Sequence, residues 1–131
     1  MAIPHIFFVD DDNIACTFVS TRLEHCGFNV SCAHNGQESL QFLKENTPDL
    51  IILDLIMPGM GGYDVLEKIR ANKATKHIQV IILTAREDEN DKAKGVKMGV
   101  DDYITKPYVA EEFVARISAV LKKAKSAQGK K

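Results

Sequence analysis

The sequence lacks the features that membrane, secreted and nucleic-acid-binding proteins need. No apolar run approaches the roughly 20 residues that cross a bilayer. The start, MAIPHIFFVDDD, has neither the basic segment nor the cleavage site of a secretory signal. Seventeen basic residues nearly balance eighteen acidic ones, so the net charge favours no polyanionic partner. We therefore expect a cytoplasmic protein with no membrane partner and no direct nucleic-acid binding by this domain.

Cysteine is scarce and shows no pattern. Cys16, Cys26 and Cys32 are odd in number and have no CxxC spacing, which argues against a disulfide framework or a zinc site. The four histidines show no metal-ligand spacing either. We expect the three cysteines to be buried thiols.

Length and composition indicate one domain. A chain of 131 residues that is 45% hydrophobic and 27% charged fits a single compact domain with a full core, which we place at residues 1–124. The last residues, 125–131, have no apolar stripe and are predicted to form a basic, disordered tail or a truncated linker.

Strand and helix patterns alternate along the chain. Apolar runs at residues 3–9, 28–33, 50–53 and 78–83 predict strands, and residues 101–105 predict a shorter fifth strand. The runs LIIL and IQVIIL are apolar on both faces, as in central parallel strands covered by helices on each side. Each strand is followed by a helical pattern, and the first helix is predicted to bury Ile14, Ala15, Phe18, Val19, Leu23 and Cys26. Five such units predict a parallel sheet with helices on both faces.

Polar residues follow the predicted strands where each strand ends. Asp10 and Asp11 follow the first strand, and Asp54, Thr84 and Lys106 end the third, fourth and fifth. The carboxyl ends of such strands share one edge, and ligands bind there where the strand order reverses. These five residues should therefore converge on one site. Because clustered carboxylates repel one another and lose hydration, the cluster indicates a cation or a reaction.

The residue types at this edge indicate phosphoryl chemistry. Carboxylate oxygens suit Mg²⁺, with Mn²⁺ as a substitute. A cation beside Asp54 would make its carboxylate a nucleophile toward phosphorus, with Lys106 neutralising the phosphoryl oxygens and Thr84 donating a hydrogen bond. Taken singly, Thr84 could merely end a strand and Lys106 could be a solvated surface residue, but their joint spacing favours the site.

Four motifs in order, FFVDDD, PDLIILDLIMPGMGG, VIILTA and GVDDYITKPY, resemble the receiver domain of two-component response regulators over residues 5–121. The resemblance implies an α/β, flavodoxin-like (βα)5 fold: a doubly wound parallel five-stranded sheet with strand order 2-1-3-4-5. It implies a phosphoacceptor signalling domain rather than an enzyme. Phosphoryl transfer from a histidine kinase or phosphotransfer protein to Asp54 would change the surface of the fourth helix, fifth strand and fifth helix. That surface would control an output partner or domain that the sequence leaves unidentified.

The resemblance implies roles for individual residues at the metal. Asp54 would accept the phosphoryl group, Asp11 would bind Mg²⁺ directly and Asp10 would assist through water. The backbone carbonyl of Ile56 would be a further ligand. We expect Asp12 to cap the first helix rather than bind the metal.

Other residues would bind and report the phosphoryl group. Lys106 would pair with it and Thr84 would hydrogen-bond it, while the bond between Lys106 and Pro107 would be cis. Thr84 would move inward and Tyr103 would fill the space it leaves, although Tyr103 also fits an ordinary half-buried strand aromatic.

Three sets of residues bear on rate, loop order and assembly. Ile56 and Arg86 occupy positions that tune phosphate lifetime, and the apolar Ile56 predicts no unusually fast self-hydrolysis. Gly61 stands where an aspartate is common in the family, so we expect a looser loop there. Asp101, Asp102 and Arg116 resemble charges that cross a dimer interface in transcription-factor receivers. A phosphorylation-dependent homodimer is one hypothesis for them, and a solvated charge pattern is the other.

Two other functional classes remain at this point. A haloacid-dehalogenase-type phosphatase also uses a strand-end aspartate and Mg²⁺, but it needs a DxD motif at the nucleophile and usually a cap domain. Asp54 begins no DxD motif, and the acidic run at residues 10–12 lies away from it in the sequence. A flavodoxin-like binding module would leave Asp54, Thr84 and Lys106 unexplained. The chain is either a complete single-domain regulator or the receiver of a longer protein.

Overall fold

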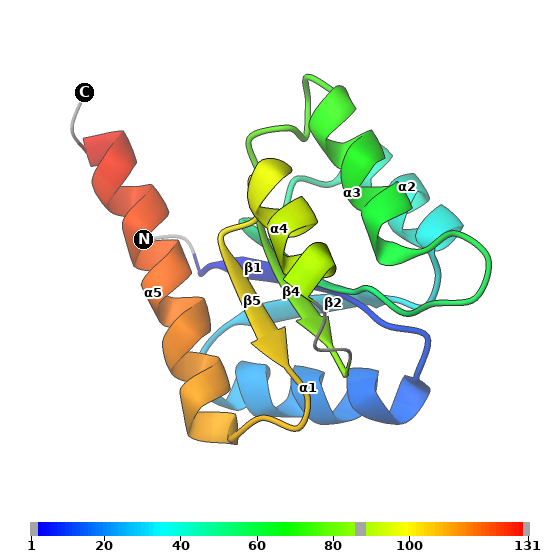
Figure 1. Cartoon of the computed structure of the whole chain (residues 1–131). Helices are drawn as coiled ribbons and strands as arrows, with labels where there is room; N and C mark the ends of the chain where they lie inside the picture. The colour runs from blue at the N-terminus through cyan, green and yellow to red at the C-terminus, as the bar shows by residue number, and fades with distance from the viewer. Residues whose placement is uncertain (1–2, 86–88, 130–131) are drawn as a thin grey trace.

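The fold is an open parallel sheet covered by helices on both faces (Figure 1). The structure is a computed structural model that describes residues 3–85 and 89–129. The strands run in the order β2-β1-β3-β4-β5 and every neighbouring pair is parallel, which confirms the predicted flavodoxin-like topology. The strands are β1 (His5–Val9), β2 (Asn29–Ala33), β3 (Leu50–Asp54), β4 (Gln79–Thr84) and β5 (Asp102–Thr105).

Two apolar clusters lie on opposite faces of this sheet. One packs under α1 (Asn13–His25) and α5 (Ala110–Gly129). The other packs under α2 (Gly36–Glu45) and α3 (Gly62–Ala71), and it continues toward α4 (Glu89–Lys97) through Met98 and Val100. The three interior strands, β1, β3 and β4, contribute side chains to both clusters, as the apolar sequences of β3 and β4 predicted for those two.

The first helix presents a different face to the core from the one predicted. Its buried residues are Cys16, Val19 and Leu23, whereas Ile14 and Phe18 are 80% and 61% exposed. Residues 14 and 18 share one side of a helix with a period of 3.6 residues, and residues 16, 19 and 23 share the other. Both sides carry apolar residues, and the sheet contacts the second.

The prediction that all three thiols are buried is wrong for two of them. Cys16 is buried, Cys32 is half-buried and Cys26 is exposed. Cys26 forms the C-cap of α1 beyond the last residue that contacts the sheet, so its side chain has no core to enter.

The last helix, α5, continues to Gly129, through most of the segment predicted to be a disordered tail. Alanine, lysine and glutamine in this stretch are strong helix formers even without an apolar stripe. The domain boundary at residue 124 stays a prediction. Among the described residues, every helix is too short or too polar to span a bilayer.

Candidate functional site

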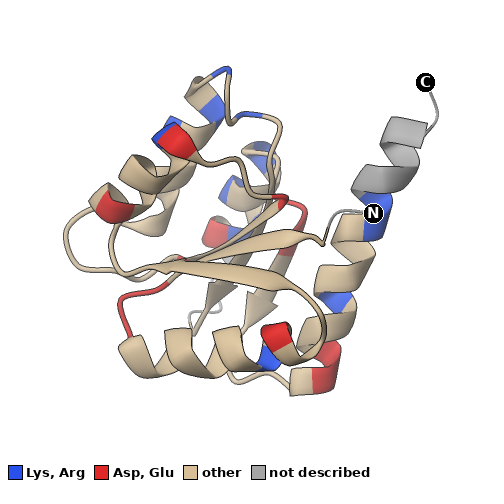
Figure 2. Cartoon of the chain, turned by 180° about the vertical axis from the view of Figure 1, so that it is seen from behind, with Lys and Arg blue, Asp and Glu red and all other residues tan. Residues whose placement is uncertain are grey.

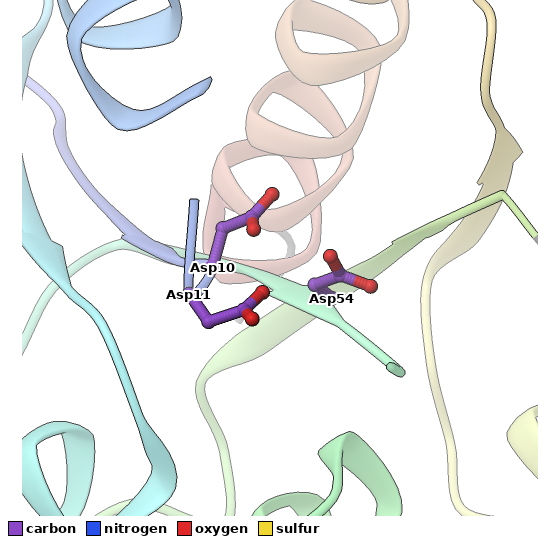
Figure 3. Close-up of side chains that lie close together, drawn as sticks. All are labelled: Asp10, Asp11 and Asp54. Carbon is purple, nitrogen blue, oxygen red and sulfur yellow. The ribbon is translucent and has the colours of Figure 1, made fainter. Parts of the chain in front are cut away.

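The register of β1 and β3 brings two aspartates side by side. Val9 pairs with Leu53, so Asp10 and Asp54 come next on adjacent strands at the carboxyl edge of the sheet. Asp11 follows in the turn toward α1. One carboxylate oxygen of each of Asp10, Asp11 and Asp54 lies within 4.8 Å of the others (Figure 3). Three oxygen ligands at this spacing could hold a hard cation.

The three carboxylates differ in exposure and in hydrogen bonding. Asp10 and Asp54 are 1% and 6% exposed, and Asp11 is exposed. Asp10 Oδ1 accepts the backbone N–H of Asp12 at 3.0 Å, and Asp54 Oδ1 accepts the backbone N–H of Ile56 at 3.0 Å. Asp11 has no hydrogen-bond partner in residues 3–85 and 89–129, which leaves its oxygens available to a ligand. Figure 2 shows this acidic turn in red where the chain enters α1.

Asp12 belongs to the same acidic run but faces the helix. Its Oδ1 accepts the backbone N–H of Ile14 at 2.9 Å and that of Ala15 at 3.4 Å. These bonds satisfy donors in the first turn of α1. The prediction that Asp12 caps the helix is therefore confirmed.

Lys106 directly follows β5, and its side chain contacts two of the aspartates. Its Nζ donates to Asp10 Oδ2 at 3.1 Å and to Asp54 Oδ2 at 3.4 Å. The backbone N–H of Lys106 donates to the Thr84 carbonyl at 2.7 Å, so the end of β4 fixes the start of this loop. The bond between Lys106 and Pro107 is cis, as predicted.

Burial affects the pKa of both Asp54 and Lys106. Burial raises the pKa of Asp54 above its usual 3.8, and Asp10 adds to the rise, while the Ile56 N–H and Lys106 oppose it. Burial alone would lower the pKa of Lys106, but the two aspartates outweigh it and the net pKa is raised. Lys106 therefore stays charged at neutral pH. The raised pKa makes the Asp54 carboxylate more basic than an ordinary aspartate.

The proposed switch residues lie on β4 and on β5, which pairs with β4 at the edge of the sheet. Thr84 is fully buried at the end of β4 and pairs with Thr105 of β5. Tyr103 is half-buried on β5, and the Nζ of Lys92 on α4 lies 5.7 Å from its ring centroid. Tyr103 thus connects β5 with α4. Arg86, predicted to tune phosphate lifetime, lies outside the described residues.

The charges predicted to lie at a dimer face are paired within the chain. Arg116 NH1 lies 3.0 Å from Asp102 Oδ1, and its NH2 lies 3.1 Å from Glu112 Oε1. Asp101 Oδ2 instead accepts the backbone N–H of Val80 at 2.9 Å. A dimer that used these residues would exchange ion pairs that the single chain already makes.

Sequence reasoning missed the role of Gly62 at the start of α3. A Cβ on Gly62 would lie 2.5 Å from the Asp54 carbonyl oxygen and 2.7 Å from the Leu55 Cα, so no side chain fits. The Gly62 N–H donates to the Leu55 carbonyl at 3.1 Å. The only signal in the sequence is the Gly61-Gly62 pair, which does not show which glycine is essential.

The loop at the neighbouring Gly61 is held by a hydrogen bond. Its N–H donates to Asp64 Oδ2 at 3.1 Å, a bond that closes the first turn of α3. Asp64 thus provides a local hydrogen bond at the position where a looser loop was expected.

Comparison with known proteins is consistent with this geometry. The family model described as "Response regulator receiver domain" matches residues 6–118. The phosphate regulon transcriptional regulatory protein PhoB of Rhizobium meliloti is 36% identical over 94% of this chain and 54% of its own length. The response regulator ArlR of Staphylococcus saprophyticus is 39% identical over 90% of this chain and 52% of its own. The chain thus spans about half the length of these curated relatives.

Solved structures match over nearly the whole chain. The Vibrio cholerae chemotaxis protein CheY4 has a TM-score of 0.86 at 27% identity and covers 91% of this chain and 99% of its own. The receiver domain of the Francisella response regulator 1452 has a TM-score of 0.85 at 32% identity, with 92% and 98% coverage.

Proposed function

Since the chain belongs to the response regulator receiver domain family of two-component signalling, we propose that it is a phosphoacceptor whose Asp54 takes a phosphoryl group from a histidine kinase or a phosphotransfer protein. The observation that carries the proposal is the contact of one lysine, Lys106, with two buried aspartates at the carboxyl edge of the sheet. A cation placed there neutralises a group that arrives with negative charge.

Mg²⁺ is the proposed cofactor, with Mn²⁺ as its substitute. Asp11 and Asp54 would bind it directly, Asp10 through water, and the carbonyl of Ile56 would complete the protein ligands. The all-oxygen donor set and the exposure of Asp11 fit a cation that keeps several waters. When bound, the ion supplies charge neutralisation at the transferring phosphoryl group.

The transfer itself needs few groups of the chain. A carboxylate oxygen of Asp54 attacks the phosphorus of a phosphohistidine, a P–O bond forms, and the P–N bond breaks as the imidazole leaves. Lys106 Nζ then exchanges its contact with the Asp54 oxygen for one with a phosphoryl oxygen. Slow hydrolysis of the acyl phosphate returns the carboxylate, so the domain takes part in its own phosphorylation but does not turn over a substrate.

The signal would leave the site through β4 and β5. Thr84 is buried at the end of β4, and its hydroxyl would turn toward the phosphoryl group. Tyr103 would follow into the space that opens, and its contact with Lys92 would carry the change to α4. The α4, β5 and α5 surface is the proposed output surface. In a phosphorylation-dependent dimer that uses this surface, Asp101, Asp102 and Arg116 would exchange their contacts within the chain for contacts with the second chain.

The phosphodonor is proposed to dock on the exposed face of α1. Ile14 and Phe18 line a groove of about 690 Å³ on this helix, together with Arg22 and His25. The helix begins two residues after Asp11, so a protein seated there holds its phosphohistidine near the acceptor edge. Two exposed large apolar side chains on one helix face are typical of a protein contact.

The deciding experiment is intact mass after incubation with acetyl phosphate and Mg²⁺. We expect a gain of about 80 Da, one phosphoryl group, that requires Mg²⁺ and is absent from Asp54→Asn. Asp49→Asn, at the other end of β3, is the matched control and should still gain the mass. A wild-type protein that binds Mg²⁺ without gaining mass would refute the acceptor role, and steady release of phosphate from a small ester would indicate a phosphatase instead.

A further inference from the structure

The helix α4 contributes little to the apolar core. Among its described side chains, residues 90–97, only Gly95 is buried, and the large apolar Val96 is 75% exposed. The Nζ of Lys92 instead lies 5.7 Å from the ring centroid of Tyr103 on β5. In this part of the helix, polar contacts rather than a buried apolar side chain hold α4 in place. A few such contacts can be exchanged without disturbing the core.

Tyr63 of α3 contacts the neighbouring α4 through both its hydroxyl and its ring (Figure 1). The hydroxyl donates to the backbone carbonyl of Asp91, and the Nζ of Lys94 lies 5.0 Å from the ring centroid. A Cβ on Gly95 would lie only 3.1 Å from the same hydroxyl oxygen. Glycine is unfavourable inside a helix, and here its missing side chain makes room for Tyr63.

Arg70, toward the other end of α3, fixes the C-terminal end of α4. Its Nε and NH2 donate to the backbone carbonyls of Met98 and Gly99, directly after α4, at 3.1 and 3.0 Å. Its NH1 donates to the carbonyl of Ile78 at 2.7 Å, so the same side chain also binds the segment that enters β4. Movement of α4 is therefore easiest at its N-terminal turns, which the Tyr63 hydroxyl holds.

The residue before Tyr63 packs on the strand of the proposed acceptor. A Cβ on Gly62 would lie 2.5 Å from the Asp54 carbonyl oxygen, so the backbone that carries Tyr63 lies directly against the end of β3. The Tyr63 hydroxyl thus attaches α4 to the part of the molecule that is fixed relative to Asp54.

We propose that Tyr63 is a restraint that keeps α4 in its unphosphorylated position, and that phosphorylation breaks its hydrogen bond to Asp91. The proposal rests on the proposed acceptor role of Asp54. Tyr63 acts on the position of α4 and not on the phosphoryl transfer itself. Because coupling between two sites is reciprocal, a protein without this restraint should bind a phosphoryl mimic at Asp54 more tightly.

Amide hydrogen exchange of the metal-free, unphosphorylated protein tests the contact. Tyr63→Phe removes the hydroxyl and keeps the ring beside Lys94. We expect exchange in α4 to be about fivefold faster, the ratio expected for one net hydrogen bond, and exchange in β3 and α1 to stay unchanged. Lys68→Gln, an exposed change on α3, is the control and should leave α4 as in the wild type. Unchanged exchange of α4 in Tyr63→Phe would overturn the proposal.

The affinity for beryllofluoride, a phosphoryl mimic, in the presence of Mg²⁺ tests the coupling. We expect Tyr63→Phe to bind it about fivefold more tightly than the wild type, whereas mere structural damage would weaken binding. Gly95→Ala, whose Cβ crowds the same hydroxyl, should also bind more tightly and should add little in the Tyr63→Phe background.

The two ways in which this measurement can fail are distinct. A wild-type protein that binds beryllofluoride, beside a Tyr63→Phe variant that binds it equally or more weakly, would overturn the restraint and leave the acceptor site standing. A wild-type protein that binds none in Mg²⁺ would overturn the acceptor site and, with it, the coupling to α4.

Discussion

Lys106 Nζ lies 3.4 Å from Asp54 Oδ2 in a part of the sheet edge where Asp54 is almost fully buried. The proposed acceptor carboxylate therefore has a cationic partner in the chain itself. The same ammonium group lies 3.1 Å from Asp10 Oδ2. One positive charge thus offsets two buried negative ones, and the balance among these three groups determines how the site responds to mutation, pH and metal.

Removing the positive charge should destabilise the protein. Lys106→Met leaves two buried carboxylates unpaired, and we expect it to lower the free energy of unfolding by about 2 kcal/mol at pH 7, less than a fully buried pair because Lys106 is partly exposed. The loss should shrink at acid pH as the carboxylates protonate. Urea denaturation measures it, with the exposed Lys73→Met as control. Equal stability of the two variants would show that the ion pairs contribute nothing.

Removing the negative charge of Asp54 should instead stabilise the protein. Burial raises the pKa of Asp54 above 3.8, so the native state holds this proton more tightly than the unfolded chain does, and ionisation costs native stability. We expect Asp54→Asn to add about 1 kcal/mol at pH 7, or about 4 °C in Tm.

The pH dependence of this gain follows from the sign of the shift. As the pH falls through the raised native pKa and then through 3.8, wild-type Asp54 becomes neutral in both states, and the advantage of Asp54→Asn should disappear. Thermal melts from pH 3 to pH 8 measure it. Asp11→Asn is the control, because exposed Asp11 should give a smaller gain. A gain that persists at pH 3 would contradict this explanation.

Mg²⁺ should stabilise the folded protein through the same carboxylates. At ten times its Kd, a ligand that binds only the native state adds about 1.4 kcal/mol. We expect Asp11→Asn to abolish this response in a thermal melt, because the exposed Asp11 is a proposed direct ligand. Asp12→Asn should keep it, since asparagine also caps a helix. An undiminished Mg²⁺ response in Asp11→Asn would remove Asp11 from the metal site.

The central strands and the converging strand ends could be predicted from the sequence for a simple reason. The runs that became β3 and β4 are apolar on both faces, so only the middle of a covered sheet suits them, and the edge that Asp54 and Thr84 occupy follows from that placement. The position of these strand-end residues at one edge of the sheet could therefore be predicted without knowledge of any contact between distant segments.

The misassigned features depend on contacts between segments distant in sequence. Apolar residues occur on two sides of α1, and only its packing on the sheet shows that Cys16 is buried and Phe18 is exposed. The contact of the Cys32 thiol with the backbone carbonyl of Cys16 joins a strand to the preceding helix at a spacing that matches no motif. The close approach of Gly62 to Asp54 likewise depends on the path of a loop.

The side chain of residue 56 should set the lifetime of the phosphoryl group. Ile56 is half exposed, and its N–H donates to Asp54 Oδ1, so in the proposed reaction its side chain would lie beside the path of an attacking water. We expect Ile56→Gln to speed dephosphorylation roughly tenfold by positioning that water, less than a full general base would. Loss of phosphoprotein mass over time measures it. Ile56→Val should match the wild type, and equal rates for Ile56→Gln would refute this role.

The exposed face of α1 should matter to a protein donor and not to a small one. Phe18→Ser should slow phosphoryl transfer from the cognate kinase about tenfold, the effect of removing one interface anchor. Acetyl phosphate labelling and Tm should stay unchanged because Phe18 is exposed. Val96→Ser, an exposed apolar residue of α4, is the matched control. Unchanged kinase transfer in Phe18→Ser, or equal slowing in both variants, would place the donor elsewhere.

The fit of Gly62 against the acceptor strand has a mechanical consequence. Because its backbone lies on the carbonyl of Asp54 and bonds that of Leu55, the start of α3 and the end of β3 behave as one rigid piece. The fixed part of the site is thus on the α3 side. Any segment that moves when the proposed acceptor is phosphorylated must lie on the other side, where the chain leaves β4 and β5.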